Sequence, residues 1–379
     1  MAEPVLGCAE PTLEAPAVRV RFTGSGAEYF RIWSVNLTLT ILTLGLYSAW
    51  AKVRRLQYFY RHTELDGAVF DYVASPQGIL LGRVIALVLL VLYYVAFQYS
   101  PQAGAGVTAL LMVALPYLLW QSNRFKARNT RYRGLAFGFD GTVGDAYRVY
   151  LPAIVVGFGP TLVVTLWHDP RANNMVLWVS IAAILMLPVL HAMYRRYVQC
   201  NLRYGDTPFV FSARPADFAA VWAWGLGAMV VGAIGFFILM TLVMRLSMVI
   251  AGKGASALIG AFALGLLSAW ISYLLIGSYF TARFQTLVWE RTAVGTIGLR
   301  CDIGAWRLLR VQMLNTLWVI LTLGIYRPFA AIRLARYRLE CMTASHVRTL
   351  DGVAARPDDR RVGATGEGAA EFFDMDVGI

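Results

Sequence analysis

The sequence predicts an α-helical polytopic membrane protein: six strong spans, two weaker segments that either span or re-enter the membrane, and a small cytoplasmic antiparallel β-sheet built from repeated hairpins. Composition is the first observation. Of the 379 residues, 58% are apolar and 15% are charged, whereas a soluble domain carries about 25% charged residues. The other two are a series of long apolar segments and, between them, short stretches in which apolar residues alternate with others.

Six apolar segments are long enough to cross a bilayer, whose hydrocarbon core of about 30 Å needs about 20 residues of helix. They are Ile79–Gln98, Ala103–Gln121, Val149–Trp167, Asn174–Tyr194, Ala219–Leu246 and Ala257–Tyr279. Two further segments, Phe30–Trp50 and Trp306–Tyr326, are weaker because they contain Asn, Thr and Gly. We expect the six strong segments to form three membrane hairpins.

Basic residues predict the topology. They gather in four connectors, at residues 52–61, 122–148, 195–218 and 283–310, and such clusters mark the cytoplasmic side. If the weak segments crossed fully, both ends of the chain would lie outside together with their arginines. Two interpretations are open: eight full spans, or six spans with two re-entrant or interfacial segments and cytoplasmic termini. We favour the second, which obeys the charge rule.

Alternating residues near the membrane segments predict short strands. They are Val18–Phe22, Phe70–Tyr72, Phe137–Phe139, Phe209–Phe211 and Ile297–Leu299. A glycine-containing turn precedes each of the last four, and glycine supplies the positive φ of a tight hairpin. We expect a membrane domain over residues 18–350 with these hairpins interleaved, a flexible N-terminus at 1–17 and a disordered acidic tail at 351–379.

The two weak segments match each other at a constant spacing of 279 residues, within repeats near 18–60 and 297–339. Leu42-Thr43-Leu44-Gly45-Leu46-Tyr47 aligns with Leu321-Thr322-Leu323-Gly324-Ile325-Tyr326. The candidate residues for a transport pathway or a helix seam are Asn36, Thr43, Gly45, Tyr47, Asn315, Thr322, Gly324 and Tyr326. A broken segment exposes backbone groups to a substrate in transporters, whereas a helix seam uses Gly, Thr and Asn for close packing. Both alternatives stay open.

Enzyme chemistry has no sequence support. The four histidines are far apart, and the sequence shows no metal-binding pattern, nucleophile–base set or P-loop. We therefore expect no cofactor, no metal and no catalytic residues. The net charge of +12 is assigned to anionic lipid headgroups rather than to nucleic acid, because arginines collect in cytoplasmic loops of membrane proteins.

The run from Phe22 to Gly67, with Thr43-Leu44-Gly45-Leu46-Tyr47-Ser48-Ala49-Trp50 at its centre, resembles the YjgN-like family of bacterial inner-membrane proteins. The similarity extends over nearly the whole chain. It implies a multi-pass protein of the bacterial inner membrane. It brings no catalytic or ligand-binding residues, because the function of that family is unassigned.

Two functions are consistent with the sequence. The first is a transporter or channel-like protein for a small molecule or a lipid, with the paired Gly-broken segments along its path. The alternative is a non-enzymatic scaffold or regulatory subunit that binds another envelope protein through its tail, where the candidate docking residues are Phe372, Phe373, Asp374 and Asp376. The expected partners are the bilayer, anionic headgroups and a membrane protein, and the sequence also allows a homo-oligomer.

Overall fold

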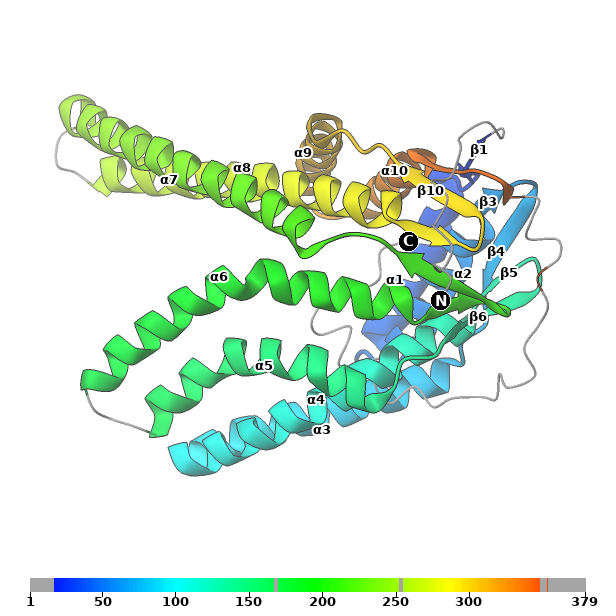
Figure 1. Ribbon diagram of the computed structural model, residues 1–379. Helices are drawn as coiled ribbons and strands as arrows, with labels where there is room; N and C mark the ends of the chain where they lie inside the picture. Colours follow the sequence, from blue (N-terminus) through cyan, green and yellow to red (C-terminus); the bar gives the residue numbers. More distant parts are fainter. Residues whose placement is uncertain (1–16, 167–169, 252–254, 348–352, 354–379) are drawn as a thin grey trace, which may run out of the picture.

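The computed structural model describes residues 17–166, 170–251, 255–347 and 353 (Figure 1). Within this part of the chain there are eleven strands and ten helices. The strands are β1 (Val18–Arg19), β2 (Arg21–Phe22), β3 (Thr63–Leu65), β4 (Ala68–Tyr72), β5 (Thr130–Tyr132), β6 (Leu135–Phe139), β7 (Leu202–Tyr204), β8 (Thr207–Phe211), β9 (Thr292–Val294), β10 (Ile297–Cys301) and β11 (Met342–Ala344). The helices are α1 (Gly26–Leu42), α2 (Ser48–Arg61), α3 (Pro76–Tyr99), α4 (Pro101–Asn129), α5 (Val143–Leu166), α6 (Pro170–Cys200), α7 (Pro215–Ala251), α8 (Ala255–Glu290), α9 (Ala305–Leu321) and α10 (Arg327–Glu340).

One pattern recurs five times along the described chain. The chain leaves the sheet on a strand, forms two helices, and returns on a strand that is hydrogen-bonded to the one on which it left. The paired strands are β2 with β3, β4 with β5, β6 with β7, β8 with β9, and β10 with β11, all antiparallel. Each helix pair is therefore a hairpin whose two ends are held at the sheet.

Two-residue turns join each of these units to the next. Asp66 and Gly67 both have positive φ, at 50° and 73°, and Arg133 and Gly134 repeat this geometry. Two positive φ angles in succession define a type I′ turn, which fits the twist of antiparallel strands. The other two turns place a glycine with positive φ, Gly205 or Gly295, at the first turn position. The four predicted hairpin turns are thus present in the structure.

The sheet is nearly closed into a ring. Its strand order runs β1-β11-β10-β9-β8-β7-β6-β5-β4-β3-β2, and the two ends of this order belong to one extended segment. Val18 pairs with Ala344, Phe22 pairs with Thr63, and the intervening Val20 N–H donates to the Met342 carbonyl at 3.0 Å. The N-terminal segment therefore joins the last helical hairpin to the first.

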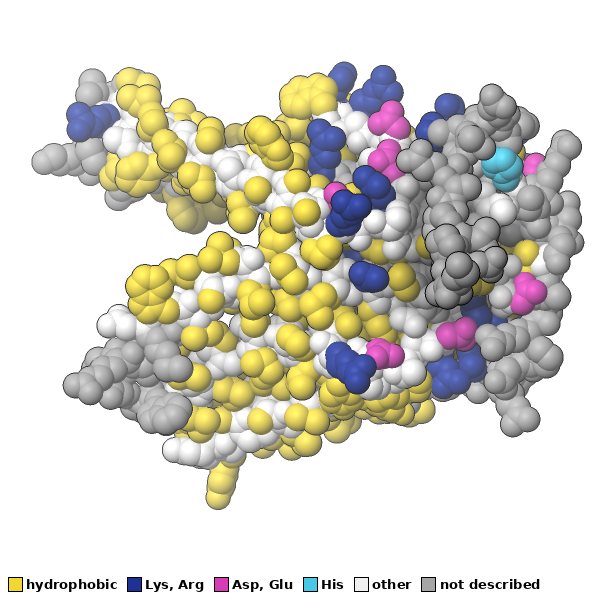
Figure 2. Space-filling view, viewed as in Figure 1, with side chains coloured by type: hydrophobic (Ala, Val, Ile, Leu, Met, Phe, Trp, Pro, Cys, Tyr) yellow, Lys and Arg dark blue, Asp and Glu magenta, His cyan; other side chains and the backbone are white. Residues whose placement is uncertain are grey.

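The long helices extend from one side of this ring (Figure 1). Five stretches are long and apolar enough to cross a membrane, namely Pro76–Tyr99, Pro101–Asn129, Val176–Cys200, Pro215–Leu246 and Phe262–Glu290. Figure 2 shows apolar side chains covering these helices, with most of the charged side chains near the sheet. The separation matches a bilayer around the helices and water around the ring.

The predicted fold class is wrong in two respects. The described residues contain five candidate spans rather than six, because the expected Val149–Trp167 lies in α5, which is not among them, and ends outside the described residues. The sheet is not the small one that was predicted from the repeated hairpins, but an eleven-stranded, nearly closed ring. Closure depends on pairing between β1 and β11, which are far apart in sequence, and local alternation contains no information on such contacts.

Candidate functional site

The first and last helical hairpins, α1–α2 and α9–α10, are shorter than the other three, and we call them the short hairpins. In each stretch predicted as one weak segment, the chain reverses direction. The first reversal lies between Leu42 and Ser48, and the second lies between Leu321 and Arg327. Neither α1 nor α9 is a candidate span in the described structure. Because β1 pairs with β11 and α1 packs against α10, the two short hairpins are neighbours.

The reversal in the first short hairpin is a Schellman turn, in which the last carbonyls of a helix bind the next N–H groups. Gly45 N–H donates to the Thr40 carbonyl at 2.7 Å, and Leu44 N–H donates to the Ile41 carbonyl at 3.1 Å. The Thr43 hydroxyl adds a bridge: it donates to the Leu39 carbonyl at 2.7 Å and accepts from Tyr47 N–H at 2.9 Å.

The second short hairpin repeats these contacts at the aligned positions. Gly324 N–H donates to the Val319 carbonyl at 2.7 Å, and the Thr322 hydroxyl accepts from Tyr326 N–H at 3.0 Å. Every backbone N–H of residues 43–48 and of residues 322–327 donates a hydrogen bond to an acceptor inside its own hairpin. A non-helical backbone can lie in the hydrocarbon core only when its N–H and C=O groups have hydrogen-bond partners within the protein.

The surfaces of the two turns are apolar. Leu44 is 96% exposed and Leu323 is 94% exposed, and both have φ of 50°. A left-handed conformation costs a residue other than glycine about 1 kcal/mol. In each turn, Leu and Ile residues on either side are also exposed. We call residues 41–46 and 320–325 the apolar tips.

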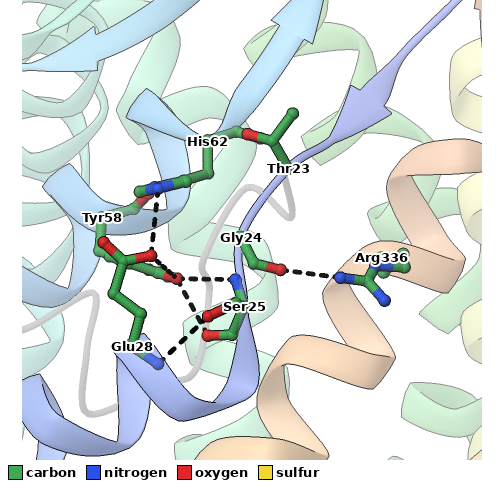
Figure 3. A network of polar contacts seen from close by, with 7 residues as sticks. All are labelled: Thr23, Gly24, Ser25, Glu28, Tyr58, His62 and Arg336. Atoms are coloured by element: carbon green, nitrogen blue, oxygen red, sulfur yellow. Dashed lines mark hydrogen bonds and ion pairs between the residues drawn. The ribbon is translucent and has the colours of Figure 1, made fainter.

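A polar network holds the base of the first short hairpin against α10 (Figure 3). Tyr58 Oη accepts from Ser25 N–H at 2.9 Å and lies 3.0 Å from the Ser25 carbonyl and 3.2 Å from Glu28 Oε2. Arg336 Nη2, from α10, donates to the Gly24 carbonyl at 2.8 Å. In the second short hairpin, the aligned Tyr337 donates to the Gly304 carbonyl at 3.1 Å. Through Gly24 and Ser25, the start of α1 is thus bound to both α2 and α10.

A cavity of about 610 Å³ lies between the short hairpins. Its walls are Tyr29, Trp33, Asn36, Leu37 and Thr40 from α1; Ser48, Ala51, Lys52, Arg55, Leu56, Phe59 and Tyr60 from α2, with Thr63; Arg83 from α3; and Arg327, Pro328, Ala331, Leu334, Ala335, Arg338 and Leu339 from α10. The volume is within the range of small-molecule sites, about 300–1,000 Å³. Five of the lining side chains are basic, and none of the described lining residues is acidic.

The predicted site residues fall into three places. Thr43, Gly45, Thr322 and Gly324 form the reversals, and an added Cβ at either glycine would meet no described atom within 4 Å. These glycines therefore provide positive φ of 93° rather than close helix packing. Tyr47 stacks on Trp50, Tyr326 stacks on Phe329, and an arginine lies over each tyrosine ring, Arg54 over Tyr47 and Arg333 over Tyr326.

The two asparagines have different surroundings. Asn36 lines the cavity and is 7% exposed, whereas Asn315 Nδ2 donates to the Ala330 carbonyl at 3.2 Å and tethers α9 to α10. The Oδ1 atoms of both are buried without a hydrogen-bond partner in the described structure. Of the eight predicted residues, only Asn36 lies in the cavity wall. The tail residues Phe372, Phe373, Asp374 and Asp376 lie outside the described residues.

The basic lining residues were missed as site residues by the sequence analysis. Lys52 and Arg55 were treated only as topology charges in a connector. They lie three residues apart in a helix, a spacing that puts two side chains on one face. The sequence contained two signals for these site residues. One was this spacing, and the other was the lack of basic residues at the aligned positions Ala331 and Leu334.

A family described as "Bacterial protein of unknown function (DUF898)" matches residues 17–372. The chain belongs to this family. Curated relatives named "Inner membrane protein YjgN" include one from Escherichia coli K12, 27% identical over 187 residues, or 47% of this chain and 46% of the relative. Another, from Salmonella typhimurium, is 28% identical over 138 residues, or 36% and 35%.

The chain matches less than half the length of these curated relatives. No solved structure matches the chain. The relatives' names and the apolar helices together support a multi-pass protein of the inner membrane, and they agree with the YjgN-like resemblance of the sequence.

Proposed function

We propose that this protein takes up a lipid or a small amphiphilic molecule into the cavity between the short hairpins and moves it within or across the membrane. The observation that carries the proposal is the cavity itself, whose walls combine basic and apolar side chains beside the exposed apolar tips. A binding site for an amphiphile needs both kinds of wall, because one end of the ligand is solvated and the other is not.

The lengths of the helices support a cavity at the membrane interface. The 17 residues of α1 are about 25 Å long at 1.5 Å per residue. Since the helix starts at the sheet, it ends short of the far side of a core about 30 Å thick. The 37 residues of α7 are long enough to cross it. The short hairpins therefore reach less far into the membrane than the long helices do. The space beside them is open to lipid from the side.

A transport assay tests the proposal. The full chain is reconstituted into liposomes that contain a fluorescent phospholipid, and the rate of exchange between leaflets is measured. Ala331→Trp places a large ring in the cavity wall, and we expect it to reduce the rate at least about tenfold. Leu46→Trp is the control, because Leu46 is exposed on an apolar tip and does not line the cavity. Wild-type protein with the same rate as protein-free liposomes contradicts transport of lipid.

We also propose that the sheet and both described ends of the chain face the cytoplasm. The ends lie on one side because β1 pairs with β11, and the basic connectors join helices to this sheet. Cys200 is exposed, and it ends α6 two residues before β7 begins. In a variant that keeps only this cysteine, a membrane-impermeant maleimide should react after permeabilisation and not in intact spheroplasts. Reaction in intact spheroplasts would place the sheet outside.

A further inference from the structure

We propose that the cavity between the short hairpins is a phosphate site, in which basic side chains from three helices bind the phosphate ester of a lipid headgroup. This inference rests on the proposed function and names the ligand class. The same chemistry would recognise a soluble phosphate ester, so the experiment below includes one as a separate probe.

The cavity gathers its basic side chains from separate elements. Lys52 and Arg55 come from α2, Arg83 from α3, and Arg327 and Arg338 from α10. No acidic residue is among the described lining residues. An anion bound in this space would be attracted by several basic side chains at once.

The five basic side chains differ in exposure: Lys52 is buried, Arg83 and Arg338 are partly buried, and Arg55 and Arg327 are exposed. Lys52 is only 7% exposed, and burial lowers the pKa of the Arg338 guanidinium below its usual value. Arg55 and Arg327 can reach a phosphate in this open space and bind it through charge-assisted hydrogen bonds.

Neutral groups orient two of the arginines. Arg338 Nε donates to Gln285 Oε1 at 2.8 Å, and Arg83 Nη1 donates to Ser48 Oγ. The Gln285 amide oxygen orients the Arg338 guanidinium without neutralising it. Arginine held in this way is suited to phosphate, which it binds through paired, charge-assisted hydrogen bonds.

The rest of the wall favours a lipid over a soluble ester. Leu37, Leu56 and Leu334 line the same cavity, and the first apolar tip begins at the residue after Thr40, which also lines it. The positions from Ser48 to Phe59 on α2 cover about 16 Å of helix, which is longer than one phosphate. We therefore place the phosphate among the basic side chains and the start of the acyl chains along the leucines.

Native mass spectrometry of the full chain in detergent measures this binding. Three probes are used: phosphatidylglycerol, diacylglycerol with the same acyl chains, and glycerol 3-phosphate. The cavity variant is Arg55→Gln with Arg327→Gln. The matched control is Arg54→Gln with Arg333→Gln, since these arginines lie over Tyr47 and Tyr326 and do not line the cavity. Thermal unfolding of each variant shows that it is folded, and Arg55→Lys with Arg327→Lys tests rescue by charge.

We expect phosphatidylglycerol to bind at least about tenfold more tightly than diacylglycerol, which corresponds to one or two charged contacts. The cavity variant should lose this preference, the control variant should keep it, and the lysine variant should restore part of it. Equal loss in both glutamine variants, or equal binding of the two lipids, overturns the phosphate site. Equal binding of the two lipids leaves the proposed function intact, whereas binding of neither lipid removes both. Glycerol 3-phosphate binding as tightly as the lipid supports the phosphate site and overturns the lipid as its source.

Discussion

The two short hairpins share one turn, yet they contribute different side chains to the cavity between them. Where α2 has Lys52 and Arg55, the aligned positions of α10 have Ala331 and Leu334. Where α10 has Arg327 and Arg338, α2 has Ser48 and Phe59. All of these residues line the cavity. At each of these aligned pairs, one wall has a basic side chain and the other wall has a neutral one.

The difference separates residues that shape the backbone from residues that face the ligand. The tip residues and the tyrosine at the base, Tyr58 or Tyr337, make similar contacts in both hairpins. Cavity residues differ at most aligned positions. We infer that the shared positions maintain two neighbouring reversals, and that the differing positions give the cavity its charge and shape.

The largest expected effect is at the apolar tips. Leu44→Asp, or Leu323→Asp in the other hairpin, places a carboxylate where an exposed leucine meets the bilayer, at a cost of up to about 2.5–3.5 kcal/mol. We expect similar losses of stability for the two substitutions, measured by unfolding in lipid nanodiscs. Leu44→Ala and Leu323→Ala are the size controls. Tolerance of Asp at one tip but not at the other would show that the hairpins lie at different depths.

The threonine bridge should matter next. Thr43→Val removes the hydroxyl that accepts from Tyr47 N–H, and Thr322→Val does the same for Tyr326. An unpaired N–H away from water costs about 1–3 kcal/mol, so both variants should lose about that much stability in the same unfolding assay. Thr43→Ser and Thr322→Ser keep the hydroxyl and should be close to wild type. A neutral valine variant would mean that water reaches the turn.

The base of the hairpins should respond unequally. Tyr58 Oη lies within hydrogen-bond distance of three groups, whereas Tyr337 Oη donates to the Gly304 carbonyl and also interacts with the Cys341 thiol. Each neutral hydrogen bond contributes about 1 kcal/mol. Thermal unfolding should therefore show a greater loss for Tyr58→Phe than for Tyr337→Phe. Equal losses would contradict the role of the network in Figure 3.

The smallest effect concerns pH. Burial raises the pKa of Tyr58 to about 12, above the ordinary value of about 10 that applies in the unfolded chain. Folding thus favours the neutral phenol, and its contribution is fully present below pH 10 and is lost as the pH rises through about 12. Wild type should lose slightly more stability over this range than Tyr58→Phe does. Parallel pH profiles would show that this phenol is not protected.

Local features of the fold were predictable, because they depend on adjacent residues. The glycines of Asp66-Gly67 and Arg133-Gly134 indicate turns, and both have positive φ in the structure. The 279-residue spacing aligns the two tips. The closed ring was not predictable, since the pairing of Val18 with Ala344 joins opposite ends of the chain. The same closure brings α1 against α10, so the cavity was beyond sequence reasoning for the same physical reason.

The candidate site was only partly predictable. Asn36 was singled out for its polarity inside an apolar segment, and it does line the cavity. Lys52 and Arg55 were assigned to the headgroup layer. A sequence alone does not show whether a basic side chain faces lipid headgroups or a neighbouring helix. That distinction requires the position of α10, which the ring determines.

The central claim is that the space between the short hairpins holds a lipid phosphate, and a density map of the full chain in phosphatidylglycerol nanodiscs tests it most directly. We expect density for a headgroup among Lys52, Arg55 and Arg327, with acyl chains leaving beside Leu37 toward the apolar tips. A map in which side chains close this space, or in which ordered lipid lies only along the long helices, would contradict it.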